Sequence, residues 1–192
     1  MKFNYHSPRE DMLLGYARLG LSEKIDNLPD FTANNTYEEK FAKYESYLVK
    51  EISVLQEIAF DGYMILLQDL VVVSREISGF VQSYGTIQNS LTAYVLGITD
   101  TYEFDYLRDF INFTPFTKKP KINIVVSVFS KPGCIGYVKH KYPQLVKKTT
   151  KSSIIFKDGL KVKFIDLDID AKVDEDDLNP EILQLIQKNK IL

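Results

Sequence analysis

Two aspartates separated by one residue, in the segment 164–170, are the first residues whose types and spacing could do chemistry. Asp166 and Asp168 would lie on one face of a strand, and paired carboxylates can hold the divalent cations of phosphoryl transfer. With Asp170 they also match the first ligand positions of an EF-hand loop, but Ala171 stands where that loop needs glycine. A solvated acidic surface is the simpler interpretation.

Other residue types that commonly do chemistry are sparse. His6 and His140 are the only histidines, and neither has a neighbour at the spacing of a metal site. Cys134 is the single cysteine, which excludes an internal disulfide, and it is expected to be a small core residue rather than a catalytic thiol. The sequence contains neither a P-loop nor a G-x-S-x-G nucleophile elbow.

Charge is divided unevenly along the chain. Residues 118–163 contain twelve lysines and one acid, a net charge of +11, whereas residues 164–192 carry −5 and the first 117 carry −8. Such asymmetry is typical of a nucleic-acid-binding surface. Two oppositely charged, solvated parts that neutralise each other would produce the same pattern.

Length and composition predict one folded domain over residues 1–192. The 192 residues are 45% hydrophobic and 12% aromatic, enough for a sizeable core. The N-terminus has no apolar signal segment, and Gln68 and Asp69 interrupt the longest apolar stretch. We therefore expect a soluble cytoplasmic protein, with no membrane association.

The first part of the domain, residues 1–117, is expected to be mostly helical. Capping patterns at Ser7 and Thr36 precede amphipathic runs, and Gly20, Gly79 and Gly97 are predicted to end helices. Helices are expected over residues 8–19, 37–58, 63–77, 87–96 and 100–113. On the first helix, the apolar residues at helical spacing are Met12, Leu13, Tyr16 and Leu19.

The second part, residues 118–192, is expected to be rich in strands and to end in a helix. Ile122, Ile124 and Val126 alternate with other residues as in a strand, and Asp158-Gly159 joins two further strand-like runs as a hairpin. Short helices are expected at 135–141 and 182–188. Because the helices come first and the strands later, the pattern indicates an α+β fold with helices packed on a small, mainly antiparallel sheet.

Several of these segments resemble the bacterial C-family replicative polymerases, the α subunits of DNA polymerase III. The segment LTAYVLGITD, residues 91–100, is nearly identical to the family's LVAYLLGITD, and residues 37–77 resemble the two helices before it. The likeness covers residues 12–146 and 165–189. It implies a reduced polymerase palm, resembling a nucleotidyltransferase, without the family's PHP-type and C-terminal domains and with a deletion within the palm.

The resemblance also implies that the polymerase site has lost its metal ligands. The family holds two Mg²⁺ ions with the aspartates of a P-D-I-D-I-D-F strand. Lys121, Asn123 and Val125 stand at the three aspartate positions. A lysine ammonium repels Mg²⁺ and a neutral amide replaces a carboxylate poorly, so we expect no polymerase activity, no bound metal and no cofactor.

The family's phosphate-binding loop, G-R-G-S-A-A-G-S, is altered as well. Gly85, Thr86 and Ser90 remain compatible with phosphate contacts at a helix start, whereas Gln88 and Asn89 replace smaller residues. An ordinary capped helix explains the segment more simply.

Three classes of function remain open. The first is a catalytically inactive, replication-associated protein that binds DNA through its lysines: Lys118, Lys119, Lys121, Lys131, Lys139, Lys141, Lys147 and Lys148. The second is an interaction or decoy module for a replication protein or a companion polymerase chain, in which the helix over residues 63–77 would face the partner. The third is a residual metal-dependent nucleotidyltransferase that uses Asp166 and Asp168. The sequence does not predict the oligomeric state.

Overall fold

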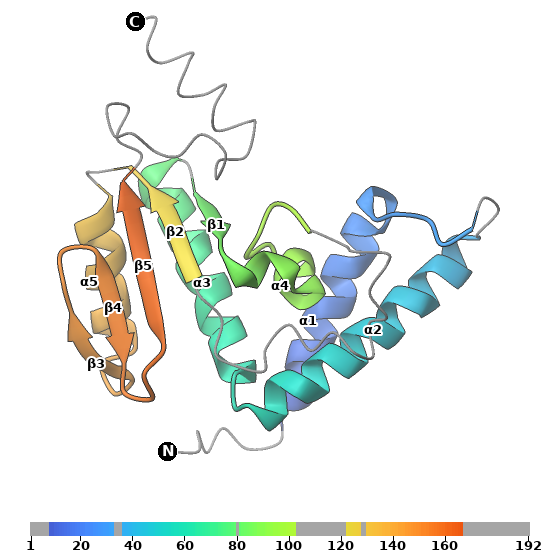
Figure 1. The fold of residues 1–192 in the computed structure, drawn as a ribbon, viewed down its shortest axis with the longest axis horizontal. Helices are drawn as coiled ribbons and strands as arrows, with labels where there is room; N and C mark the ends of the chain where they lie inside the picture. Colours follow the sequence, from blue (N-terminus) through green and yellow to red (C-terminus); the bar gives the residue numbers. More distant parts are fainter. Residues whose placement is uncertain (1–7, 33–35, 80, 103–121, 128–129, 167–192) are drawn as a thin grey trace, which may run out of the picture.

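A computed structural model of the protein describes residues 8–32, 36–79, 81–102, 122–127 and 130–166. The helices are α1 (Pro8–Lys24), α2 (Tyr37–Glu57), α3 (Asp61–Ser78), α4 (Leu91–Val95) and α5 (Lys131–Lys141), with 3-10 turns at Ile25–Asn27 and Thr86–Asn89. The strands are β1 (Gln82–Tyr84), β2 (Ile122–Val126), β3 (Val146–Thr149), β4 (Ser153–Phe156) and β5 (Lys161–Asp166). Figure 1 shows the sheet packed against α3 and α5, with α1, α2 and α4 beside it. The predicted α+β class is confirmed.

The five strands form one sheet in the order β1-β2-β5-β4-β3. β2 runs parallel to β5, and the other three neighbouring pairs are antiparallel, which confirms the mainly antiparallel sheet. The predicted hairpin at Asp158-Gly159 joins β4 to β5, and Gly159 has the positive φ of 92° that such turns favour in glycine. The sequence did not predict β1, because three residues are too few to display an alternating pattern.

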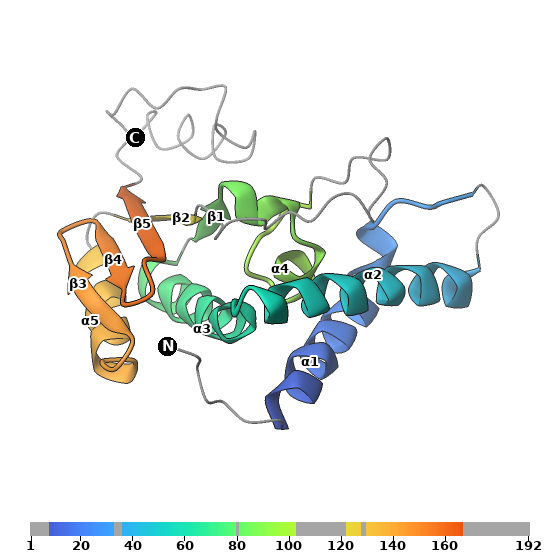
Figure 2. The ribbon, with the colours of Figure 1, turned by 60° about the horizontal axis from the view of Figure 1, so that its bottom comes forward.

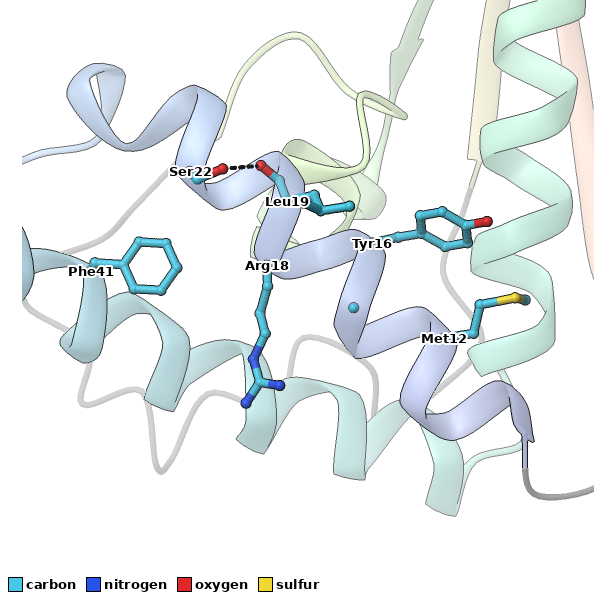
Figure 3. Close-up of a pocket in the computed structure, with 7 residues that line it drawn as sticks. Met12, Tyr16, Arg18, Leu19, Ser22 and Phe41 are labelled. Carbon is cyan, nitrogen blue, oxygen red and sulfur yellow. Dashed lines mark hydrogen bonds between the residues drawn. The ribbon is translucent and has the colours of Figure 1, made fainter.

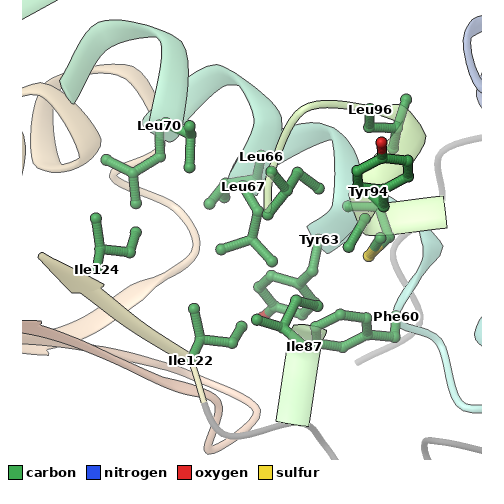
Figure 4. Packing of buried hydrophobic residues seen from close by; sticks show 14 of the residues in the cluster. Phe60, Tyr63, Leu66, Leu67, Leu70, Ile87, Tyr94, Leu96, Ile122 and Ile124 are labelled. Atoms are coloured by element: carbon green, nitrogen blue, oxygen red, sulfur yellow. The ribbon is translucent and has the colours of Figure 1, made fainter. Parts of the chain in front are cut away.

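One face of this sheet is covered by helices and forms the main core. Its side chains come from β2, β4 and β5, and all are buried: Ile122, Ile124, Val126, Ile154, Phe156, Val162 and Phe164. Figure 2 shows α3 and α5 on the same side of the strands, and Figure 4 shows Ile122 and Ile124 facing Leu66, Leu67 and Leu70 of α3. The apolar helix over residues 63–77 is therefore largely core, so its buried side is not available to a partner.

The second helix follows the sequence prediction closely. The Thr36 hydroxyl accepts a hydrogen bond from the Glu39 N–H at 3.2 Å, and the Glu39 carboxylate accepts one from the Thr36 N–H at 3.0 Å. This capping box satisfies two N–H groups that would otherwise lack partners at the helix start. The predicted apolar stripe is buried at Tyr44, Leu48, Ile52 and Leu55.

The first helix differs from the prediction in its end and in its buried face. It continues through Gly20 to Lys24, because Gly20 lies against α4 rather than at a helix end. A Cβ atom added at Gly20 would lie 2.0 Å from the Val95 carbonyl oxygen, so only glycine permits this close approach. Leu13, Ala17 and Leu21 are buried, whereas the predicted apolar residues Tyr16 and Leu19 are 47% and 63% exposed.

The segment after β1 is also more irregular than predicted. The single helix expected over residues 87–96 is instead a 3-10 turn at Thr86–Asn89, a break at Ser90 and the short helix α4. The Ser90 hydroxyl accepts from the Ala93 N–H at 2.9 Å and thereby caps α4. Gly79 and Gly97 follow α3 and α4 with positive φ angles, as expected of helix ends.

Some predictions fall outside the described residues. These are the cap at Ser7, most of the helix predicted over 100–113, the helix at 182–188, and the candidate residues Lys118, Lys119, Lys121 and Asp168. The helix predicted at 135–141 begins earlier, at Lys131, with Pro132 in its first turn. In the described ranges, no helix combines the length and the hydropathy that a membrane span requires.

Candidate functional site

Asn123 lies in the middle of β2, where the polymerase resemblance implies a metal ligand. Its partners in register are Tyr84 on β1 and Lys163 on β5. Ile122 and Ile124 face the helices and are buried, so the alternation of the strand directs Asn123 to the opposite side of the sheet. The structure therefore places a lysine beside Asn123.

The side of the sheet away from α3 and α5 is here called the open face. Residues paired in register share a face, so the pairings with Asn123 extend the open face across β5, β4 and β3. Its members are Gln82, Tyr84, Asn123, Val125, Lys148, Ser153, Ile155, Lys161, Lys163 and Ile165, and of these Gln82, Val125 and Ser153 are buried. The three lysines are exposed. Their charges would attract phosphate groups and repel a divalent metal ion.

Asp166 is the only acidic residue in the described strands, and it lies on the other side of the sheet. It pairs in register with Val126, whose side chain is buried under the helices. Its Oδ2 forms an ion pair with Lys131 at the start of α5, while Oδ1 is buried without a hydrogen-bond partner among the described residues. Asp166 is thus held on the side away from Asn123.

The position of Asp166 on the helix-covered side affects the predicted metal pair of Asp166 and Asp168. Asp168 lies outside the described residues, as does most of the EF-hand-like stretch. In the part of the chain that the structure describes, no group of three or more His, Cys, Asp or Glu side chains could hold a metal ion. A two-metal site also needs carboxylates that converge on one point, and Asp166 and Asn123 diverge.

The loop that resembles a phosphate-binding segment is filled by the protein's own side chains. Ser90 is fully buried, and its hydroxyl donates to the carboxylate of Glu51 on α2. The other Glu51 oxygen accepts from the Leu91 N–H at 3.0 Å, at the start of α4. The Gln88 side chain accepts from the Gly85 N–H at 3.2 Å. These groups occupy N–H donors that a phosphate would need, which favours the ordinary capped helix.

Glu51 is the most perturbed carboxyl group in the described structure. Burial raises its pKa to about 7, although hydrogen bonds from Ser90, Thr92 and Leu91 act in the opposite direction. The Leu91 and Thr92 N–H groups at the start of α4 donate to Glu51 and favour its ionised form. Glu51 therefore accepts hydrogen bonds at the start of α4, and sequence reasoning missed it, because its helical position carried no functional signal.

The predicted lysines of α5 are not gathered on the open face. Lys131 is paired with Asp166, and Lys141 donates to both oxygens of Asp69 on α3 at 2.8 and 2.9 Å. The Asp69 hydrogen bond is the largest cause that raises the pKa of Lys141. Lys139 is exposed and makes no ion pair with any described residue. Lys131 and Lys141 thus connect elements of the fold.

Lys161 and Lys163 are functional candidates that the sequence analysis counted only within the basic segment. The alternation Lys161-Val162-Lys163-Phe164 could have predicted that both lysines point away from the core, because Val162 and Phe164 are apolar and face it. What the sequence lacked was the order of the strands, which brings Lys163 beside Asn123.

Two simpler predictions agree with the structure. Cys134 is completely buried in α5, and burial raises the pKa of its thiol, as expected of a core residue rather than a nucleophile. His140 is exposed on the same helix. Thr86 is exposed and Gly85, which has a φ of 108°, is half-buried.

Comparison with known proteins gives a consistent result. The family described as bacterial DNA polymerase III alpha NTPase domain matches residues 16–175. DNA polymerase III subunit alpha of Helicobacter pylori strain J99 is 34% identical over 91 residues, and that of strain 26695 is 33% identical over 91 residues. Each match covers 47% of this chain and 7% of the relative, so the chain aligns with a small part of either protein.

Proposed function

The chain belongs to the bacterial DNA polymerase III alpha NTPase-domain family, and we propose that it is a catalytically inactive member that binds DNA. Membership makes it a replication-related polymerase homologue. The observation that supports the finer proposal is the open face, where Lys163 lies beside Asn123 and Lys161 and Lys148 lie on the same side of the sheet.

The proposed inactivity follows from the groups around Asn123. Two-metal catalysis needs anionic oxygens that hold both cations against the transferred phosphate. Here an amide and the Lys163 ammonium lie side by side, and Lys121 replaces a further acid in the sequence. Asp166 cannot compensate from the other side of the sheet, where it is paired with Lys131. The residual nucleotidyltransferase hypothesis is therefore the weakest of the three.

The proposed DNA contact uses the same face. Residues 122–166 contain nine lysines and two aspartates, so this segment carries a net charge of +7. Lys148 on β3 and Lys161 and Lys163 on β5 lie on the same side of the sheet, with β4 between them, and the partly exposed Tyr84 lies on β1 at the far edge. A row of ammonium groups beside an aromatic ring is typical of surfaces that follow a phosphate backbone.

The test is a titration of labelled primer–template DNA at about 50 mM and 200 mM salt, with Mg²⁺ and dNTPs in the same samples. We expect salt-sensitive binding without primer extension. The double variant Lys161→Gln/Lys163→Gln should lower the slope of log affinity against log salt by about 2, since each lost phosphate contact removes about 0.9.

A matched control tests whether DNA binding depends on the lysines of the open face or only on the total positive charge of the protein. Lys43→Gln/Lys50→Gln removes the same two charges from exposed positions on α2, and it should leave the slope nearly unchanged. Equal losses in both double variants would reject the open face as the DNA site. Primer extension that Asp166→Asn abolishes would restore the nucleotidyltransferase hypothesis.

A second candidate function, a protein-interaction module, is favoured by the exposed side of α1. Tyr16 and Leu19 project from this helix, and Phe41 extends from α2 toward it (Figure 3). They line a pocket of about 640 Å³ whose walls are mainly apolar, together with Met12 and Arg18. Clustered apolar side chains at a surface are typical of contacts between proteins. A replication protein or a companion polymerase chain is the proposed partner.

Sedimentation with a purified DNA polymerase III α subunit from the same cell tests this second function. Leu19→Asp should abolish co-sedimentation, because it places a charge in the apolar surface, whereas Val72→Asp on α3 should not. Both leucine and valine are exposed, so neither change should unfold the protein. If the wild type sediments alone at every concentration, this partner is excluded.

A further inference from the structure

A second basic site lies on the helix-covered side of the sheet, away from the open face. It is a pocket of about 480 Å³ between α5 and the β3–β4 turn, here called the α5 pocket. The residues that matter for its chemistry are Lys131, Gly136, Lys139, Thr149, Lys151 and Asp166. Thr149 pairs in register with the buried Ile154, and Asp166 with the buried Val126, so both belong to the helix side.

The charges of the α5 pocket favour an anion. Asp166 is already neutralised by its ion pair with Lys131, whose side chain is only 12% exposed. Lys139 and Lys151 are exposed and make no ion pair with any described residue, so two ammonium groups are left for a ligand. The pocket extends along α5 from Lys131 in the first turn to Lys139 in the last turn.

The shape of the α5 pocket depends on a glycine. Gly136 lies in the middle of α5, where glycine weakens a helix relative to alanine. A Cβ atom added there would meet no atom within 4 Å, so packing does not explain its small size. The missing side chain leaves space beside Lys139 and Thr149. Apolar walls from Pro132 and Ile135 border this space.

We propose that the α5 pocket binds a nucleotide-sized phosphate ester. Its phosphate lies between Lys139 and Lys151, and its base and sugar lie against the apolar wall at Ile135. A volume of about 480 Å³ falls within the range of small-molecule sites. Such a phosphate has two sources, a free nucleotide or the 5′-phosphorylated end of a DNA strand, and both present the same chemistry.

Amide chemical shifts of the ¹⁵N-labelled protein test the proposal directly. Addition of dAMP should shift the Gly133, Gly136 and Thr150 amides, whereas deoxyadenosine without phosphate should not. Lys139→Gln and Lys151→Gln should each weaken dAMP binding by about tenfold, the effect of losing one charged hydrogen bond. Equal binding of deoxyadenosine and dAMP, or unshifted pocket amides, would overturn the proposal.

A size-matched pair of variants locates the ligand. Gly136→Gln and Gly136→Glu fill the same space and differ only in charge. Loss of dAMP binding with both variants supports occupation of the pocket, and loss with Gly136→Glu alone supports recognition of the negative charge. Unchanged binding with both variants contradicts the proposal. The urea midpoints of the two variants establish that each is folded.

Two further experiments identify the source of the phosphate and distinguish binding at the α5 pocket from binding at the open face. An oligonucleotide with a 5′-phosphate that displaces dAMP, when its 5′-hydroxyl counterpart does not, assigns a DNA end. Displacement by neither oligonucleotide assigns a free nucleotide. Lys161→Gln/Lys163→Gln should retain dAMP binding, so failure of DNA binding at the open face leaves this inference intact.

Discussion

The two faces of the sheet come from the same strands, yet they differ in the side chains that they present. On the helix-covered face, the seven side chains from β2, β4 and β5 are all apolar, and each is at most 2% exposed. On the open face, the same strands present Asn123 and the exposed Lys161 and Lys163, beside the buried Val125 and Ser153. The covered face therefore forms the core of the fold, whereas substitutions at the exposed lysines of the open face leave that core undisturbed.

The largest expected effect comes from truncating a side chain on the covered face. Phe156 is completely buried, and its ring lies 5.3 Å from that of Tyr63 on α3. Phe156→Ala should lower the free energy of unfolding by about 3–5 kcal/mol, measured by urea titration, because it removes buried area and leaves a cavity. The adjacent Ile155 faces the other way, and Ile155→Ala should cost about 1 kcal/mol or less. Similar losses of unfolding free energy in Phe156→Ala and Ile155→Ala would contradict the difference between the two faces.

Glu51 is a buried carboxyl group, and its protonation should change the free energy of unfolding almost as much as Phe156→Ala does. Because its pKa rises from 4.5 to about 7 on folding, the folded state binds more protons between these values. The contribution of Glu51 to the free energy of unfolding should therefore fall by about 3 kcal/mol as the pH rises through this window. Urea titrations of the wild type and Glu51→Gln across that pH range measure the contribution of Glu51 to the free energy of unfolding. A difference between the two proteins that stays constant with pH contradicts it.

Two glycines of α1 extend the comparison to a smaller effect. Gly20→Ala should lower the free energy of unfolding by about 1–3 kcal/mol, because the added methyl collides with the Val95 carbonyl. Gly15 has no atom within 4 Å of an added Cβ, and Gly15→Ala should stabilise the protein by about 0.5–1 kcal/mol. Thermal unfolding of the two variants should therefore shift in opposite directions. Shifts of the same sign would mean that α1 and α4 do not meet at Gly20.

The smallest expected effect belongs to the open face itself. Lys161→Gln/Lys163→Gln should change the free energy of unfolding by no more than about 0.5 kcal/mol, because both side chains are exposed. The same variant should strongly weaken DNA binding. A large loss of stability would show that these lysines belong to the fold rather than to a binding surface.

The sequence predicted those features that short segments determine. The capping box at Thr36, the hairpin at Asp158-Gly159 and the alternation of β2 all appear in the structure, since each depends on neighbours within a few positions. The family resemblance predicted the altered site at Asn123. These features sufficed for the fold class.

The features that the sequence missed depend on contacts between distant segments. Gly20 carries the local signal of a helix end, and only the approach of α4 explains why the helix continues. Tyr16 and Leu19 match a buried stripe as well as Leu13 and Ala17 do, and the position of α2 and α4 decides which pair is covered. Likewise, the lysines of α5 and β5 occur in one basic segment but lie on opposite sides of the sheet.

The parallel pairing of β2 with β5 has a consequence for how the chain folds. β4 and β5 are joined by a tight turn, so their hairpin can form within microseconds, about 1–10 μs in isolated hairpins. β2 reaches β5 only after α5, β3 and β4 have been placed, because all three lie between them in the chain. The sheet should therefore grow outward from the hairpin, with β1 joining last. In pulse-labelling hydrogen exchange, the amides of β4 and β5 should gain protection first, and Asn123 should become aligned with Lys163 only late in folding.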